Sequence, residues 1–281
     1  MKLGKFQVDL LSDGEFALDG GQMFGVIPRV LWEKKISPDD RNRIPMALTS
    51  LLVRTGEHTV LIETGIGDRM SEKDRDIFGL QKPTDLLKDL ARVGVSREEV
   101  DIVINTHLHF DHCGWNLMSG EGGATVPTFP QARYYVQKGE WERGLSHSLR
   151  EKGNYRKDYF TDATGDLGGR MSLLEGNQEI VPGIRVEVLP GHTRHLQGVW
   201  IWSEGAEALF VSDLFPTAAH VSYPWIAAFD LFPLETLENK QRLFPELARR
   251  GTLVIFPHDI KTPAVRMREE GGRFAAVPVE I

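Results

Sequence analysis

The sequence predicts an α/β protein in which two β-sheets pack together and are covered by helices. Short runs of β-branched and aliphatic residues alternate with segments of helical periodicity, and each half of the chain contains a β-hairpin pattern. The 281 residues, of which 41% are hydrophobic, are enough to bury a sizeable core. We therefore expect a single domain that spans residues 1–281.

The first half of the chain contains a predicted hairpin, a helix and a buried strand. Residues 48–64 carry two aliphatic runs around a Thr-Gly-Glu-His turn. Residues 84–93 have apolar side chains at helical spacing, and Ser96 with Glu99 resembles a capping box that opens a short helical turn. The apolar run 101–105 then predicts a buried strand.

The second half of the chain repeats this alternation. Residues 132–137 and 184–189 read as strands, and residues 199–211 read as a second hairpin around Ser-Glu-Gly. Residues 235–250 have the leucine spacing of a helix, and residues 252–256 form a final apolar run.

Three segments fit this scaffold poorly, namely residues 20–47, 142–172 and 214–233. Long irregular segments of compact domains are often binding loops or lids. The alternative is that they are surface covers whose aromatic side chains pack on the core. The apolar character of residues 20–47 further indicates either a lid or a homodimer contact.

Composition restricts the partners and the compartment. The formal net charge is −7, so we expect neither nucleic acid nor an anionic membrane as a partner. No apolar run is long enough to predict a transmembrane helix, and residues 1–6 lack the apolar core of a secretory signal. We therefore expect a cytoplasmic protein. The single cysteine, Cys113, excludes an intramolecular disulfide and is expected to be a small packed residue.

The chemistry begins with the run His107-Leu108-His109-Phe110-Asp111-His112, directly after the predicted strand 101–105. Side chains at positions i and i+2 of an extended chain point to the same side, so His107 and His109 can reach one metal together. Imidazole and carboxylate are ligands that zinc, manganese and iron accept. Such a density of polar groups after an apolar strand is unfavourable without a metal.

Three later residues each follow a strand-like stretch: His192, Asp213 and His258. Taken singly, each histidine could be a surface residue and the aspartate a helix N-cap. The site begun by residues 107–112 needs more ligands, however, and neighbouring strands end at the same edge of a sheet. We therefore interpret all three as ligands.

The order of these side chains resembles that of the metallo-β-lactamase-fold superfamily from the 48–64 hairpin to His258. Residues 61–65, Leu-Ile-Glu-Thr-Gly, are similar to the family's Leu-Ile-Asp-Thr-Gly, with Glu63 in place of the aspartate. The resemblance implies a four-layer αβ/βα sandwich of two mixed sheets flanked by helices. It also implies a dinuclear metal centre, with zinc as the expected metal and manganese, iron or cobalt as alternatives.

The resemblance also implies a role for each ligand. The first metal would be held by His107, His109 and His192, the second by Asp111, His112 and His258, and both by Asp213. A hydroxide that bridges the two cations would attack the substrate, and Asp111 would also accept or relay a proton as a catalytic residue. The candidates for orienting the histidines are Glu63, Thr64 and Asp259.

An aspartate at position 213, rather than a cysteine, resembles the hydrolase branches of the superfamily. Residues 18–28, with Leu-Trp at 31–32, resemble quorum-quenching lactonases that cleave N-acyl-homoserine lactones. Arg194 and Pro216 depart from the pattern, because many members have a small residue at the first position and several lactonases a tyrosine at the second.

We therefore expect a hydrolase that opens a small lactone or related ester. An apolar wall for its acyl arm is expected from Met23, Phe24, Phe215, Tyr223 and Trp225. A phosphodiesterase or organophosphate hydrolase and a glyoxalase II-like thioesterase of the same fold remain alternatives. A non-enzymatic metal-binding protein is disfavoured, since all seven ligand positions are filled.

Overall fold

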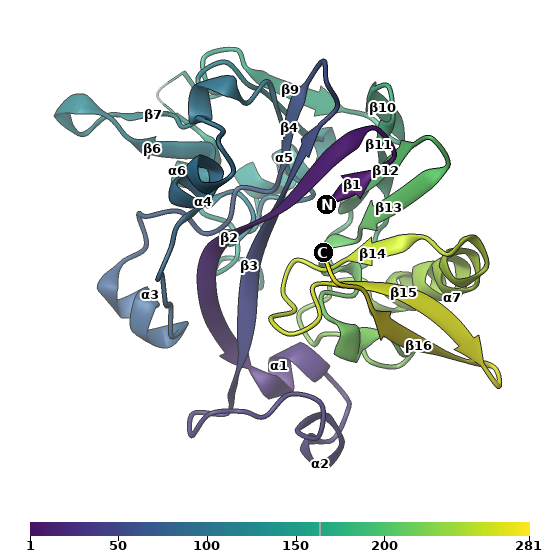
Figure 1. Cartoon of the computed structure of the whole chain (residues 1–281). Coiled ribbons are helices and arrows are strands. Elements are labelled where there is room, and N and C mark those ends of the chain that lie inside the picture. Colours follow the sequence, from purple (N-terminus) through teal and green to yellow (C-terminus); the bar gives the residue numbers. More distant parts are fainter. Residues whose placement is uncertain (163) are drawn as a thin grey trace. The chain divides into compact units, whose positions relative to one another are not determined.

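The computed structural model describes residues 1–162 and 164–281, which form two compact units. The first unit consists of Met1–Gly14 and Leu48–Gly176. The second unit consists of Glu15–Ala47 and Asn177–Ile281. Two mixed β-sheets with helices are present (Figure 1), which confirms the predicted fold class. The assignment of residues 1–281 to a single domain stays a prediction.

The first large sheet has the strand order β1-β2-β3-β4-β5-β8-β9. Its strands are β1 (Lys2–Leu3), β2 (Phe6–Asp19), β3 (Arg43–Arg54), β4 (Thr59–Ile62), β5 (Ile102–Ile104), β8 (Arg133–Gln137) and β9 (Met171–Leu174). The strands β3 and β4 form the predicted antiparallel hairpin, while β4, β5, β8 and β9 run parallel. A separate ribbon pairs β6 (Leu117–Ser119) with β7 (Thr125–Pro127).

Short helices connect the strands of the first unit. They are α3 (Glu72–Ile77), α4 (Leu86–Arg92), α5 (Lys138–Leu145), α6 (Lys157–Phe160) and the 3-10 helices η1 (Arg97–Glu99), η2 (Gly114–Asn116) and η3 (Glu121–Gly123). The predicted helix over 84–93 is confirmed as α4, in which the Asp85 carboxylate accepts a hydrogen bond from the backbone N–H of Lys88. The predicted capping box of Ser96 and Glu99 is present at η1.

The buried carboxylate of Asp13, on β2, joins several loops of the first unit. It accepts hydrogen bonds from the backbone N–H groups of Ile66 (2.8 Å), Gly67 (3.0 Å) and Leu86 (3.0 Å), from Nε1 of Trp115 (2.8 Å) and from Nζ of Lys82 (2.7 Å). Gly65 has a positive φ of 60°, and a Cβ atom there would lie 2.5 Å from Cβ of Asp13. Only glycine therefore fits at the end of the Leu-Ile-Glu-Thr-Gly segment.

The second large sheet has the strand order β10-β11-β12-β13-β14-β15-β16. Its strands are β10 (Gln178–Val181), β11 (Ile184–Val188), β12 (Gln197–Ser203), β13 (Ala206–Phe210), β14 (Leu253–Ile255), β15 (Ala264–Glu270) and β16 (Arg273–Pro278). The strand β12 is antiparallel to both β11 and β13, and β13 is parallel to β14. The strands β11, β13 and β14 therefore run in the same direction.

The helices of the second unit are α1 (Gly20–Phe24), α2 (Arg29–Trp32), α7 (Pro233–Arg250) and the 3-10 helices η4 (Ser212–Leu214) and η5 (Ala218–His220). The predicted helix over 235–250 is confirmed as α7, which starts with a proline and ends before Gly251 in the left-handed conformation. Its apolar face, with Leu243, Phe244 and Leu247, is buried against β15 and its neighbours. Within residues 1–162 and 164–281, no helix combines the length and the apolar character needed to span a bilayer.

The three irregular segments contain more regular structure than the sequence indicated. Residues 20–47 include α1, α2 and the start of β3, residues 142–172 include α6, and residues 214–233 include η5. Residue 163 of the middle segment lies outside the described residues. The long strand β2 and the hairpin β15–β16 were not predicted, because their polar and charged residues interrupt the apolar alternation.

Candidate metal centre

The histidine run of the first unit follows the carboxyl end of β5, as the sequence predicted. The backbone N–H of Asn105 still pairs with the carbonyl of Tyr135, so the run starts from a fixed sheet edge. The rings of His107 and His109 have centroids 4.5 Å apart, and those of His107 and His112 have centroids 4.1 Å apart. All three imidazoles are buried, which places a dense group of ligand nitrogens out of contact with bulk water.

Glu63 lies beneath this run. Its Oε1 atom accepts hydrogen bonds from the backbone N–H of Thr106 at 3.1 Å and from the Thr106 hydroxyl, and it lies 3.5 Å from Nδ1 of His112. Burial raises the pKa of the Glu63 carboxyl. Glu63 also has a φ of 65°, a strained conformation for a residue with a side chain, and such strain is concentrated at functional sites.

A buried polar network fixes the end of the run by holding the backbone carbonyl of His112. This carbonyl accepts hydrogen bonds from the backbone N–H of Thr64 at 2.9 Å and from Nδ2 of Asn105 at 3.1 Å. The Asn116 side chain links the other two, donating to Asn105 at 2.8 Å and accepting from the Thr64 hydroxyl at 2.9 Å. Thr64 thus supports the backbone of His112 rather than an imidazole nitrogen.

Glu140, which the sequence did not single out, supports the start of the run. Its Oε1 atom accepts hydrogen bonds from the backbone N–H of Leu108 at 3.2 Å and from the Tyr155 hydroxyl at 2.7 Å. The Tyr155 ring packs edge-on against the ring of His109, with centroids 4.7 Å apart. Cys113 is fully buried, and this burial raises the pKa of its thiol, which fits the expected packing role.

In the second unit, three predicted ligands meet at one sheet edge because they follow the parallel-running strands β11, β13 and β14. The carboxylate of Asp213 lies between two imidazoles: Oδ2 is 3.5 Å from Nε2 of His192, and Oδ1 is 3.2 Å from Nε2 of His258. All three side chains are buried. Ser212, which precedes the aspartate, has a φ of 53°, a second strained position beside a predicted ligand.

The hydrogen-bond partner of Nδ1 determines which ring nitrogen of His258 carries the hydrogen. Nδ1 lies 2.8 Å from the carbonyl oxygen of Ala47, which can only accept, so Nδ1 carries the hydrogen. In the neutral ring, Nε2 then directs a lone pair at the Asp213 carboxylate 3.2 Å away. Two electron pairs at this distance repel each other unless the ring is protonated or a cation lies between them. The imidazole nitrogen and the carboxylate oxygen therefore fit a metal ion as ligand atoms.

His192 is held in the same way by a side chain that the sequence did not reveal. Its Nδ1 atom lies 3.0 Å from Oδ1 of Asp230, and the Thr236 hydroxyl donates a hydrogen bond to Oδ2 of that carboxylate at 2.7 Å. Asp230 follows His192 by 38 residues and belongs to no predicted element, so only the folded structure identifies it.

Of the other candidates, Asp259 does not reach an imidazole nitrogen. Its carboxylate accepts hydrogen bonds from backbone N–H groups of Ala218 at 2.9 Å, Lys261 at 3.0 Å and Thr262 at 2.6 Å. The Arg194 guanidinium lies over the Phe232 ring at 3.7 Å. Both side chains therefore have structural partners.

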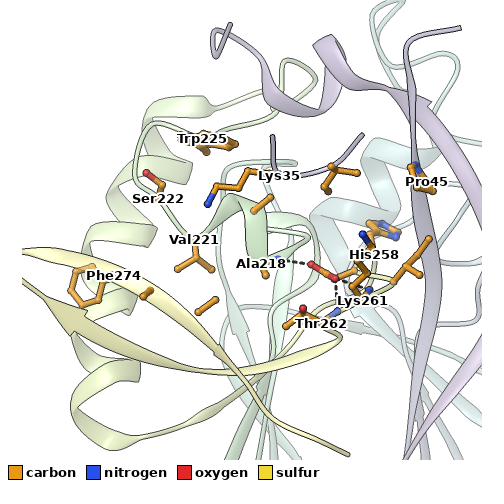
Figure 2. Close-up of a pocket in the computed structure, with 16 residues that line it drawn as sticks. Lys35, Pro45, Ala218, Val221, Ser222, Trp225, His258, Lys261, Thr262 and Phe274 are labelled. Atoms are coloured by element: carbon orange, nitrogen blue, oxygen red, sulfur yellow. Dashed lines mark hydrogen bonds between the residues drawn. The ribbon is translucent and has the colours of Figure 1, made fainter. Parts of the chain in front are cut away.

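The five predicted substrate-binding residues occupy different places. Met23, Phe24 and Phe215 are fully buried, and the Tyr223 ring stacks on Phe244 with centroids 5.4 Å apart. Trp225 lines a cavity of about 560 Å³ in the second unit that His258 also lines (Figure 2). The carbonyl of Pro216 accepts a hydrogen bond from the backbone N–H of His258 at 3.2 Å. The role of the five residues in substrate binding stays a prediction.

The chain is similar to several known proteins. Residues 44–259 match the model of the metallo-beta-lactamase superfamily. An N-acyl homoserine lactonase of Bacillus thuringiensis is 26% identical over 223 residues, covering 75% of this chain and 80% of the relative. The crystal structure of a probable metal-dependent hydrolase from Staphylococcus aureus has a TM-score of 0.89 and 31% identity, and the match covers 100% of this chain and 99% of that one.

The fold is also that of a lactonase of known structure. AidC, a dizinc quorum-quenching lactonase crystallised with a product, has a TM-score of 0.79 and 21% identity, with 100% of this chain and 97% of that chain covered. In the present chain, each unit gathers buried imidazole and carboxylate ligands suited to binding metal. The chain is therefore a metal-dependent hydrolase that belongs to the metallo-β-lactamase superfamily.

Proposed function

We propose that the seven predicted ligands hold two divalent cations and that the protein hydrolyses a lactone of the N-acyl homoserine lactone type, or a related ester. One cation would be bound by His107, His109 and His192, the other by Asp111, His112 and His258, and both by Asp213. Zinc is the expected metal, since imidazole and carboxylate ligands suit it and the related fold of AidC is that of a dizinc lactonase.

The observation that carries the dinuclear centre is the position of Asp213. Its two oxygens face Nε2 atoms of two different histidines, at 3.2 and 3.5 Å. A carboxylate with one oxygen facing each histidine can ligate two cations at once, whereas a single cation would leave one of these oxygens without a metal. The similarity to N-acyl homoserine lactonases over 75% of the chain favours a lactone as the substrate.

When bound, the cations would supply Lewis acidity and lower the pKa of water in the site. The protein supplies orientation. The Ala47 carbonyl and the Asp230 carboxylate fix the Nδ1 sides of His258 and His192, so that both Nε2 atoms remain available as ligands. Asp111 is buried, with Oδ2 3.6 Å from Nε2 of His112, and would accept the proton of the attacking water and relay it to the alkoxide oxygen that ring opening leaves.

Metal content and a substrate panel test this function. Purified protein should contain close to two metal ions per chain by elemental analysis and should lose activity on chelation. Asp213→Ala should lose paired occupancy and activity, whereas His58→Ala, in the turn between β3 and β4, should retain both. One metal ion per chain in the active wild type would contradict the dinuclear proposal.

The panel should contain acyl homoserine lactones, thioesters and phosphoesters. We expect turnover of the lactones, an activity that would quench signalling by such molecules. Turnover of thioesters or phosphoesters alone would refute the lactonase proposal and leave the hydrolase assignment in place. The cytoplasmic location and a homodimer contact through residues 20–47 stay predictions.

A further inference from the structure

The cavity of the second unit combines an apolar lining with two cationic side chains. Its volume is about 560 Å³, the size of a pocket for a small organic ligand. The apolar part of the lining includes Ile36, Pro45, Val221, Trp225, Ile260 and Phe274. Lys35 and Lys261 also line the cavity, and Figure 2 shows both among the side chains that surround it.

The wall formed by residues 220–225 is fixed from behind by a buried lysine. Lys240, on α7, has no exposed surface, and its Nζ atom donates hydrogen bonds to the backbone carbonyls of His220 (3.1 Å), Ser222 (3.2 Å) and Trp225 (2.5 Å). An ammonium group has three hydrogens, so these contacts use its full donor capacity. The hydrogen-bond donors of Lys240 are therefore used by the wall and not by the cavity.

Two further groups hold the same wall. The Thr217 hydroxyl and the carbonyl of Met23 each lie 2.8 Å from a ring nitrogen of His220, whose pKa burial lowers to about 3, so the ring is neutral. The Asp259 carboxylate accepts three backbone hydrogen bonds, one of them from Ala218. The cavity is thus preformed, and Asp259, the one carboxylate among the described residues of its lining, is already satisfied by backbone amides.

Lys240, His220 and Asp259 hold the cavity wall, whereas Lys35 and Lys261 do not. Both are exposed, and within residues 1–162 and 164–281 neither ammonium group forms an ion pair or a side-chain hydrogen bond. The charged side chains of the lining, Lys35, Lys261 and Asp259, together carry a formal charge of +1 (two lysines against one aspartate), whereas the whole protein carries −7. A neutral acyl chain would need no such charge, whereas an acyl chain that bears an anion would be stabilised by it.

We propose that this cavity receives the acyl arm of the substrate and that Lys35 and Lys261 select an arm bearing a carboxylate. The proposal rests on the proposed function, because it takes His258, which lines the cavity, as a ligand of the catalytic metals. The apolar lining contacts the methylene chain, and the two ammonium groups attract the carboxylate at the cavity mouth.

A binding experiment tests the cavity without turnover. The metal-loaded protein is titrated calorimetrically with octanoate and with octanamide, which share a chain and differ in charge. Octanoate should bind more tightly, and the double variant Lys35→Ala/Lys261→Ala should bind it about tenfold more weakly while binding octanamide unchanged. The matched control Lys34→Ala, an exposed lysine outside the lining, should behave as wild type.

Octanoate that instead coordinates the cations would bind the double variant as it binds wild type, and this result would overturn the proposal. Equal affinities of wild type for octanoate and octanamide would overturn it as well. Inorganic phosphate serves as a third probe. If phosphate displaces octanoate from wild type at similar concentrations and binds the double variant more weakly, the lysines bind any anion and the selection of an acyl carboxylate is refuted.

A kinetic experiment separates this proposal from the lactonase proposal. Two acyl homoserine lactones are compared, one with an acyl arm ending in a carboxylate and the other with its methyl ester. We expect a KM about tenfold lower for the carboxylate, with similar kcat, and loss of this difference in the double variant. Equal turnover of both substrates would refute the selectivity alone. If neither is hydrolysed, the lactonase proposal fails, and the octanoate titration still decides whether the cavity binds amphipathic carboxylates.

Discussion

Nδ1 of His192 lies 3.0 Å from Oδ1 of Asp230, and both side chains are buried. The carboxylate fixes the orientation and the tautomer of the imidazole, so that Nε2 faces Asp213. Because the Thr236 hydroxyl holds the other oxygen of Asp230, the carboxylate itself has little freedom to move. The orientation of one predicted metal ligand thus depends on a side chain outside the predicted ligand set.

Asp230→Asn should therefore weaken metal binding by about tenfold, since a neutral amide is a poorer acceptor for the Nδ1 hydrogen and leaves the imidazole less basic. Competition with a chromogenic chelator measures the affinity directly. Glu238→Gln, the same chemical change at an exposed position of α7, is the control and should leave the affinity unchanged. An unaltered chelator competition curve for Asp230→Asn would show that the contact does not support the ligand.

Asp13→Ala should lower the free energy of unfolding by about 3–5 kcal/mol, because it removes the partner of the mostly buried Lys82 ammonium and leaves buried N–H groups without an acceptor. Urea denaturation followed by circular dichroism measures the change. Glu175→Ala removes the partner of an exposed lysine, Lys138, and should have little effect. Similar effects of the two substitutions would mean that the Asp13 network contributes no more than a surface ion pair.

Lys240→Met keeps an apolar stem on α7 but removes three hydrogen-bond donors. The carbonyls of His220, Ser222 and Trp225 then lose their common partner, and the free energy of unfolding should fall by about 2 kcal/mol. Hydrogen exchange should become faster in residues 218–226 and remain unchanged in β12 and β13. Faster exchange throughout the second unit would indicate global destabilisation instead of a loosened cavity wall.

The lowered pKa of Lys240 fixes the direction in which the destabilisation by Lys240→Met changes with pH. Burial lowers the pKa of Lys240 from 10.5 to about 7, so between these pH values the folded state has released a proton that the unfolded state keeps. The contribution of Lys240 to stability therefore rises with pH across this window and is constant below it. The difference in unfolding free energy between wild type and Lys240→Met should be larger at pH 9 than at pH 6.5. A smaller difference at pH 9 would contradict the direction of the shift.

The sequence predicted the strands that depend on local pattern, and its candidate ligands follow those strands. The apolar runs before His107, Asp213 and His258 are short and uninterrupted, and their strand ends follow from chain direction. The long strand β2 escaped prediction, since Asp13, Gly14 and Glu15 interrupt its apolar residues. Its formation depends on its pairing with β1 and on the Asp13 network, which are tertiary effects.

The supporting residues of the candidate site could not be predicted. Asp230, Glu140 and Lys240 are polar residues in ordinary surroundings of sequence, and nothing in their neighbours distinguishes them from surface residues. Each becomes recognisable only through burial and through partners distant in the chain, such as Leu108 for Glu140. A sequence identifies ligands by their clustering, whereas the groups that orient them are scattered.

The two imidazoles that face Asp213 differ in how easily a mutation can remove the group that orients them. His258 is held by the main-chain carbonyl of Ala47, and every amino acid at position 47 would provide that oxygen. His192 is held by the side chain of Asp230, which a single nucleotide change can remove. A single substitution can therefore remove the group that orients the His192 imidazole but hardly the one that orients the His258 imidazole.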